Sequence, residues 1–164
     1  MLQFRNATIQ DLTWIVQVYN QTIPSQMVTA DIEPVTVESR YPWFRDHNTQ
    51  SRPLYVVMLD DHIRIGWVSY QDFYGRPAYQ ATAEISIYLE ETCRGKGFGK
   101  MILTTCVEKA ASLGIRHLVG FIFAHNLPSL RLFESVGFEK WGFLPDIALL
   151  HGKERSLCIV GKHV

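Results

Sequence analysis

The stretch Thr82-Ala-Glu-Ile-Ser-Ile-Tyr-Leu-Glu-Glu-Thr-Cys-Arg-Gly-Lys-Gly-Phe-Gly-Lys100 decides the fold. Aliphatic residues alternate with other residue types from Ile85 to Leu89, a pattern that predicts a β-strand. Three glycines follow, at 95, 97 and 99, and they let backbone amides lie close together and close to a ligand. The segment that begins at Met101 reads as a helix, so a strand, a glycine-rich turn and a helix are expected in direct succession.

The turn before this helix is suited to binding an anion. The first N–H groups of a helix have no intrahelical acceptor, and the helix dipole adds partial positive charge at the same end. Arg94, Lys96 and Lys100 bring further positive charge to the turn. We therefore expect a pyrophosphate-binding loop, with the carboxylate of Glu84 on the strand just upstream.

Two common phosphate-binding loops do not fit this turn. A P-loop requires Gly-x-x-x-x-Gly-Lys-Ser/Thr, but the first position here is Arg94 and the last is Met101. In a dinucleotide-binding fingerprint the third glycine would come one residue later than Gly99, and an acidic residue would stand near Gly120, where the neighbours are apolar. The pattern Arg/Gln-x-x-Gly-x-Gly/Ala does fit, as Arg94-Gly-Lys-Gly-Phe-Gly99, and it resembles the acetyl-CoA loop of the GNAT superfamily of N-acetyltransferases.

Composition indicates one small globular domain over residues 1–164, with 47% hydrophobic and 20% charged residues. Lys+Arg and Asp+Glu number 16 each, so no net charge favours nucleic acid or an anionic membrane. No apolar run has the roughly 18 residues of a membrane helix, and the first residues do not read as a signal peptide. Cys93, Cys106 and Cys158 have no Cys-x-x-Cys spacing, and no metal-ligand pattern occurs. We expect a reducing cytoplasm and no metal, membrane or nucleic acid.

Hydrophobic periodicity predicts one continuous α/β pattern without a linker or a repeat. Strands are expected at 2–6, 54–59, 63–70, 82–89, 116–123, 138–144 and 154–160. Helices are expected at 8–21, 36–47, 101–111 and 128–135. The order β-α-α-β-β-β-α-β-α-β-β is that of the GNAT fold, an α/β architecture with a mixed, mostly antiparallel central sheet flanked by helices.

Several segments narrow the resemblance to the phosphinothricin and methionine-sulfone acetyltransferase family. The most specific are Gly75-Arg-Pro-Ala-Tyr79 and Thr82-Ala-Glu-Ile-Ser-Ile-Tyr88, and similar segments at 9–20, 27–34 and 126–138 extend the match over nearly the whole chain. The resemblance implies acetyl-CoA as the cosubstrate, a small amino-acid-like amine as the acceptor, and a homodimer.

Glu84 is the expected general base. An amine attacks a thioester only as the free base, and an amino acid amine is mostly protonated near pH 7, so a group must remove a proton. The resemblance places the catalytic glutamate of the family at Glu84. The alternatives are a strand glutamate on a solvent face, or one paired with Arg76.

The cosubstrate contacts are expected along this strand, in the glycine loop and at Asn126. Backbone N–H groups of Ile87, Tyr88 and Leu89 could stabilise an oxyanion, unless the sheet uses them all. The resemblance gives Asn126 a hydrogen bond to the cosubstrate, whereas Asn is also a common helix N-cap. Many family members carry a Tyr acid where this chain has Phe133, so we name no general acid. The loop residues expected to bind acetyl-CoA are Arg94, Gly95, Lys96, Gly97, Phe98, Gly99 and Lys100.

Four residues are expected to border the acceptor substrate. Arg76 could bind a carboxylate through two parallel hydrogen bonds, or be a surface arginine in a turn. Tyr79 belongs to the same aromatic-rich loop. Met27 and Val28 fall where the resemblance places the first substrate loop, although they could equally fill the core.

The expected function is transfer of acetyl from acetyl-CoA to the α-amine of a small amino acid or analogue. Two alternatives remain open. One is a peptide or protein N-terminal acetyltransferase, and the other is a non-catalytic acyl-CoA-binding module on the same fold.

Overall fold

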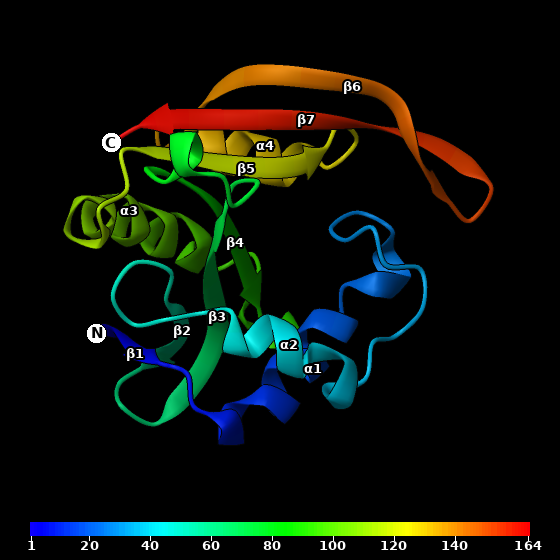
Figure 1. Cartoon of the computed structure of the whole chain (residues 1–164). Helices are drawn as coiled ribbons and strands as arrows, with labels where there is room; N and C mark the ends of the chain where they lie inside the picture. Colours follow the sequence, from blue (N-terminus) through cyan, green and yellow to red (C-terminus); the bar gives the residue numbers. More distant parts are fainter.

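A computed structural model describes all 164 residues, and its main strands and helices follow the predicted order (Figure 1). The strands are β1 (Leu2–Asn6), β2 (Leu54–Leu59), β3 (Ile63–Asp72), β4 (Thr82–Leu89), β5 (His117–Phe123), β6 (Glu139–Leu150) and β7 (Lys153–His163). The helices are α1 (Leu12–Asn20), α2 (Val37–Arg45), α3 (Phe98–Ala110) and α4 (Leu127–Glu134). One seven-stranded sheet has the order β1-β2-β3-β4-β5-β7-β6, in which only β4 and β5 pair in parallel. The predicted fold class is confirmed.

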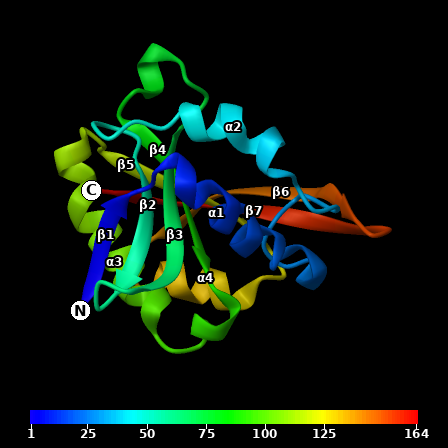
Figure 2. The ribbon, with the colours of Figure 1, turned by 90° about the horizontal axis from the view of Figure 1, so that it is seen from below.

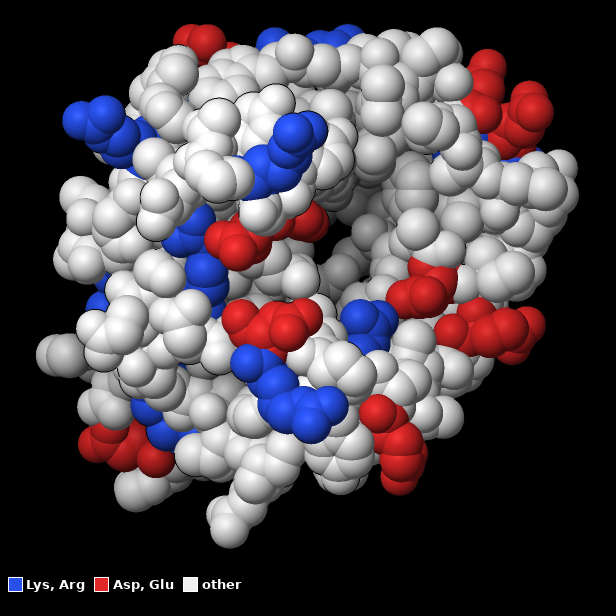
Figure 3. All heavy atoms as spheres, in the orientation of Figure 1, with Lys and Arg blue, Asp and Glu red and all other residues white.

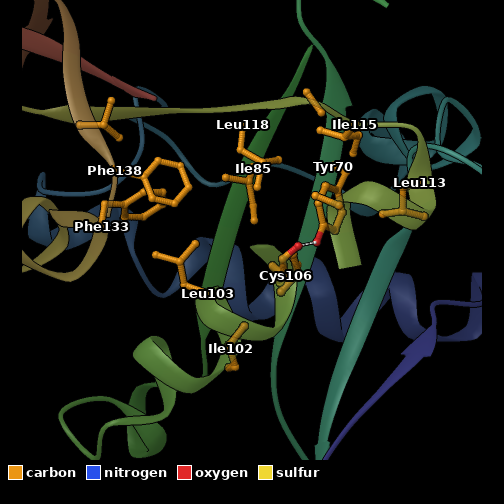
Figure 4. Close-up of a cluster of buried hydrophobic side chains, with 14 of the residues drawn as sticks. Tyr70, Ile85, Ile102, Leu103, Cys106, Leu113, Ile115, Leu118, Phe133 and Phe138 are labelled. Carbon is orange, nitrogen blue, oxygen red and sulfur yellow. Dashed lines mark hydrogen bonds between the residues drawn. The ribbon is translucent and has the colours of Figure 1, made fainter. Parts of the chain in front are cut away.

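The larger core lies between the sheet and the two helices α3 and α4. Alternation along β4 sends Ile85 into this core, and Leu103 from α3 and Phe133 from α4 meet it there (Figure 4). The fully buried Tyr70 donates its hydroxyl proton to the Cys106 carbonyl at 2.8 Å, which joins β3 to α3. This core fixes the direction of α3 relative to β4.

A second core holds α1 and α2 on the opposite face of the sheet (Figure 2). Trp67 of β3 is 3% exposed and donates its indole N–H to the Ile15 carbonyl of α1 at 3.1 Å. Trp43 of α2 packs edge-on against Trp67, with ring centroids 5.6 Å apart. The two helices are thereby held over the β3–β4 surface that carries Glu84. None of the helices is long and apolar enough to span a membrane.

Several predicted boundaries were wrong, and the larger differences have local reasons. The helix expected from residue 8 begins as a 3₁₀ turn at Ile9–Asp11, because the Asp11 carboxylate accepts the Thr8 N–H and tightens the first turn. The helix expected from Met101 begins at Phe98, directly after the left-handed Gly97. The last two strands are longer than expected because an irregularity between Leu144 and Ala148 takes up Pro145, which an edge strand tolerates.

The parallel pair β4–β5 separates after three residues. The two strands pair only at Thr82–Glu84 of β4 and His117–Val119 of β5. Beyond these residues β4 and β5 continue without pairing to each other. Figure 1 shows β4 and β5 diverging beyond this point. The backbone groups of β4 after Glu84 that point away from β3 are therefore not used by a neighbouring strand.

Buried Arg52 ties two loops together beneath the start of β4. Its guanidinium donates to Asp72 Oδ1 at 2.6 Å, to the Ser51 carbonyl at 2.8 Å and to the Gln80 carbonyl at 2.7 Å. The Arg52 side chain is only 7% exposed, whereas its partner Asp72 is 61% exposed. Arg52 thus anchors the loop that precedes β4.

Replacing Arg52 with Ala should lower the free energy of unfolding by about 2–3 kcal/mol, because the charge-assisted hydrogen bonds of the guanidinium and the packing of a buried side chain are both lost. Urea unfolding measures this loss. Arg116→Ala is the matched control, since Arg116 is an exposed arginine beside the same loops and makes no side-chain hydrogen bond, and it should cost less than about 0.5 kcal/mol. Equal losses in the two variants would show that Arg52 is not an anchor.

Candidate active site

Glu84 lies half-buried on β4 and makes no hydrogen bond or ion pair within the chain. Neither sequence-based alternative describes it, since it is not on an open solvent face and it is not paired with Arg76. Burial alone raises the pKa of its carboxyl group. A carboxylate without a partner and with a raised pKa is a stronger base than an exposed carboxylate, which suits it to accept a proton.

Glu84 lines a cavity of about 190 Å³ between the β3–β4 surface and the helices α1 and α2. Cross-strand register builds its polar floor, because Gln71 is opposite Glu84 and Ser69 is opposite Ser86. Figure 3 shows a hollow at the centre of the molecule with acidic and basic side chains around its mouth. Aromatic rings form the walls of the cavity, from Tyr19, Trp43, Trp67 and Tyr88.

Arg40 of α2 is the only cationic side chain lining this cavity. Its NH2 group donates to Asp31 Oδ2 at 3.0 Å, and its guanidinium carbon lies 4.5 Å from the centre of the Tyr19 ring. The Tyr19 hydroxyl donates to Asp31 as well, and it also hydrogen-bonds to Thr29. Asp31 therefore fixes both Arg40 and Tyr19 at the wall of the cavity.

His47 supports the cavity floor from behind. Its Nδ1–H donates to the Trp43 carbonyl at 2.8 Å, since a carbonyl can only accept, and its Nε2 lies 2.8 Å from Ser69 Oγ. Burial lowers the pKa of His47 and favours the neutral ring. Nε2 then accepts the Ser69 proton, so the remaining lone pairs of Ser69 are available toward the cavity.

A narrow slot of about 60 Å³ lies where β4 and β5 separate. Ser86 and Tyr88 line both this slot and the polar cavity, so the two spaces adjoin across one strand. On the other side of the slot, a Cβ at Gly120 would lie 3.0 Å from the Phe133 ring, so a larger residue there would crowd that wall. Ile87 also lines the slot, whereas Leu89 packs against the larger core.

Asn126 serves as the N-cap of α4 and also lines the slot. Its Oδ1 accepts the Ser129 N–H at 3.3 Å, while its Nδ2 makes no hydrogen bond within the chain. The N-cap interpretation of Asn126 is therefore confirmed, and it leaves a free donor at the slot. Phe133 is 6% exposed, borders the same slot and has no proton to donate.

The glycine loop leads into the α3 N-terminus without any side-chain cap. Gly95 and Gly97 have φ angles of +72° and +83°, whereas Gly99 packs in the first helical turn against Leu132. Arg94 folds back and donates to the Leu89 carbonyl at 3.1 Å, and Lys96 and Lys100 are exposed. The N–H groups at Phe98, Gly99 and Lys100 are thus left for a ligand, which fits a pyrophosphate.

The predicted acceptor residues fall in three different places. Arg76 and Tyr79 are exposed and line a separate shallow hollow beside the turn at Pro77–Tyr79, away from the Glu84 cavity of the single chain. Val28 lines the slot rather than filling the core. Met27 is half-buried beside it.

Sequence reasoning missed the residues that give the cavity its polarity, above all Arg40, Ser69 and Gln71. They come from a helix and a strand distant in sequence from Glu84. The one local signal was the period-2 placement of Trp67, Ser69 and Gln71 along β3, which puts them on one face.

An enzyme that transfers a group between two substrates needs two binding sites side by side. The cavity and the slot adjoin across Ser86 and Tyr88, so the structure has the arrangement of a group-transferring enzyme. The chain belongs to the acetyltransferase (GNAT) family, whose model matches residues 15–138. The predicted class, an acetyltransferase, is thereby confirmed.

Two acetyltransferases of other bacteria are similar in sequence over most of this chain. It is 51% identical over 163 residues to the "putative phosphinothricin acetyltransferase YwnH" of Bacillus subtilis, covering 99% of each chain. It is 29% identical to the L-methionine sulfoximine/L-methionine sulfone acetyltransferase of Pseudomonas aeruginosa, covering 91% of this chain and 87% of that one.

A solved phosphinothricin acetyltransferase from Sinorhizobium meliloti, in complex with AcCoA, superimposes with a TM-score of 0.90. Its sequence is 26% identical, and the match covers 99% of this chain and 88% of that one. Acetyl-CoA is thus the cosubstrate of this family, as predicted.

Proposed function

We propose that this protein transfers acetyl from acetyl-CoA to the α-amine of a small amino acid or analogue of the phosphinothricin or methionine sulfone type. The observation that carries the proposal is Glu84, a half-buried carboxylate without a partner in a small polar cavity that adjoins the slot. The names of the relatives support the acceptor class. A cavity of about 190 Å³ has the volume of about six water molecules, which suits an amino acid better than a peptide.

In the proposed reaction Glu84 removes a proton from the ammonium group, and the free amine attacks the thioester carbonyl. The carbon–nitrogen bond forms, the carbon–sulfur bond breaks, and the second proton that the nitrogen loses passes through water to the leaving thiolate. Unpaired N–H groups of β4 beyond Glu84 stabilise the oxyanion. Phe133 supplies no acid, which a thiolate leaving group does not require.

The cosubstrate is proposed to occupy the slot and the glycine loop. Its arm would pair with the free edge of β4 and accept a hydrogen bond from Asn126 Nδ2, while the pyrophosphate would sit on the first N–H groups of α3. Arg94, Lys96 and Lys100 belong to the same loop and the first turn of α3.

Thiol release from acetyl-CoA across a panel of amines tests the proposed function. The panel contains phosphinothricin, methionine sulfone, methionine sulfoximine, a polyamine and peptides. Fastest turnover of the amino acid analogues is expected. A clear preference for peptides would favour a peptide N-terminal acetyltransferase, and binding of acetyl-CoA without any turnover would favour a non-catalytic module.

We further propose a cytoplasmic homodimer. What supports the dimer is a row of exposed apolar residues on the edge strand β6, which are Trp141, Phe143, Ile147 and Leu149. Light scattering should give twice the chain mass of 18.9 kDa. Ile147→Asp should shift this mass to the monomer, whereas Ile63→Asp, a control at a similarly exposed position on β3, should not. A monomeric wild type would refute the dimer.

A further inference from the structure

We propose that His117 and His163 form a surface site for a divalent transition-metal ion of the copper, nickel and zinc class. The inference is independent of the proposed transferase activity. His117 begins β5 and His163 ends β7, and the antiparallel register places the two residues directly opposite each other. Their Nδ1 atoms lie 2.8 Å apart. The two residues are 46 positions apart in the chain, so no spacing motif in the sequence indicates the pair.

The distance between the two nitrogens is close to that of two ligands on one metal ion. Imidazole nitrogens bind Zn²⁺ at about 2.0–2.1 Å. Two such ligands are about 2.9 Å apart at a right angle, as in a square-planar copper site, and about 3.4 Å apart at a tetrahedral angle. The observed separation of 2.8 Å therefore has to grow by about 0.1–0.6 Å, which small rotations of the two rings provide.

The pair contains at least one neutral imidazole, which is the form that binds metal ions. Two ring nitrogens at 2.8 Å share one proton, because one Nδ1–H donates and the other Nδ1 accepts with its lone pair. When the donating ring moves its proton from Nδ1 to Nε2, both Nδ1 lone pairs face the ion. Binding to a neutral pair then requires a change of tautomer but no net loss of a proton.

The backbone holds both histidines in position before an ion binds. β7 pairs with β5 along the whole length of β5, and Figure 1 shows the end of β7 beside the start of β5. Just beyond the two histidines, the N–H of Val164 donates to the Arg116 carbonyl at 2.9 Å, so the pairing continues past the site. Ligands fixed in this way lose less entropy on binding.

The face of the sheet that carries the two rings has an aromatic neighbour. Trp141 of β6 packs over Gly161, where a Cβ would collide with its ring, and the centroid of this ring lies 4.9 Å from that of His163. Lys162 points to the other face, since its Nζ would lie 2.8 Å from a Cβ at Gly137. The nearest cation along β7 therefore does not repel a metal ion at the pair.

The two imidazoles are the only protein side chains that the site offers. No third His, Cys, Asp or Glu completes the ligand set, and the exposure of His163 leaves the other coordination positions to water. Two ligands are fewer than the four of a structural zinc site, so we expect reversible binding rather than a metal required for folding. Mg²⁺ and Ca²⁺ prefer oxygen ligands and should not bind.

Calorimetry on the untagged full chain, freed of metal with a chelator, tests the site with Zn²⁺ and Cu²⁺ as separate probes. One ion per chain is expected. His117→Ala and His163→Ala should each weaken its binding by about tenfold or more, because a chelate needs both rings. His62→Ala is the matched control, since His62 is an exposed histidine between β2 and β3, and it should bind the ion as wild type does.

Fluorescence locates the ion independently. Cu²⁺ quenches tryptophan emission at short range, and Trp141 lies beside His163. Cu²⁺ should therefore quench the wild type, and Trp141→Phe should remove most of this quenching while its Zn²⁺ affinity stays at the wild-type value. Ile147→Asp, the monomer variant of the proposed dimer, should bind the ion equally well, because both ligands belong to one chain.

The double variant His117→Ala/His163→Ala gives the background from all other groups. A wild type that binds Zn²⁺ and Cu²⁺ no more tightly than this variant would overturn the inference, as would quenching that survives in Trp141→Phe or loss of the site in Ile147→Asp. His117→Gln keeps a hydrogen-bonding side chain, so it guards against misfolding in the alanine variants. It should lose the ion as His117→Ala does, and retention of wild-type affinity would equally overturn the inference.

Discussion

Glu84→Gln is expected to lower kcat by about 10²–10⁴-fold, the usual contribution of a general base, with little change in acetyl-CoA affinity. Glutamine keeps the shape of the side chain but cannot accept the proton. Steady-state thiol release with methionine sulfone measures kcat, and calorimetry measures the cosubstrate affinity. Glu108→Gln, at an exposed position on α3, is the control and should behave as wild type. Activity of Glu84→Gln within threefold of wild type would remove Glu84 from the mechanism.

The raised pKa of Glu84 gives this variant a second signature. Folding favours the neutral carboxyl, so the wild type loses stability as pH rises from the ordinary carboxyl pKa through the raised one. Glu84→Gln carries no such charge and should be more stable than wild type above that range, for example in urea unfolding at pH 8. The same raised pKa should place the acidic limb of the kcat/KM profile above that of an ordinary glutamate. A variant less stable than wild type at pH 8 would contradict the assigned burial.

Gly97→Val is expected to weaken acetyl-CoA binding by about tenfold to a hundredfold. Gly97 has φ of +83° directly before α3, and a Cβ there would meet no atom within 4 Å, so the obstacle is backbone conformation rather than space. Valine in this region costs about 1–3 kcal/mol, and the loop can avoid the cost by turning the N–H groups of α3 away from the phosphates. Calorimetry with acetyl-CoA measures the loss.

Gly152→Val is the matched control for Gly97→Val in the glycine loop. Gly152 has φ of +79° between β6 and β7 and also has no neighbour within 4 Å, so the backbone strain is comparable. Its acetyl-CoA affinity should stay at the wild-type value even if stability falls. Unchanged affinity in Gly97→Val would mean that the glycine loop is only a turn.

The sequence was sufficient where the signal was local. The alternation from Ile85 to Leu89 and the glycines after it predict the order of strand, loop and helix correctly, because each depends on residues within one turn or one pleat. The start of α3 was missed because Gly99 fits within a helix as well as within a loop, and only its packing against Leu132 distinguishes the two.

The candidate site was less accessible to sequence reasoning. Glu84 and Asn126 could be recognised because their side chains lie in short sequence motifs. The separation of β4 from β5 leaves backbone groups unpaired, and no residue type in the sequence indicates this. Arg40 lines the same cavity as Glu84 because Trp43 packs α2 against Trp67 of β3. Arg76, by contrast, has a suggestive local sequence but lies in a different hollow of the single chain.

Strand β4 separates the polar cavity from the slot, so the two spaces have largely different walls. Apart from residues of β4 itself, the polar cavity is bounded by α1, α2 and β3, whereas the slot is bounded by β5, α4 with its N-cap, and Val28. Substitutions in α1 and α2 can therefore reshape the acceptor side while the acetyl-donor side stays intact. A chain built in this way can acquire new amine substrates without rebuilding its chemistry, and directed evolution of acceptor range is best aimed at α1 and α2.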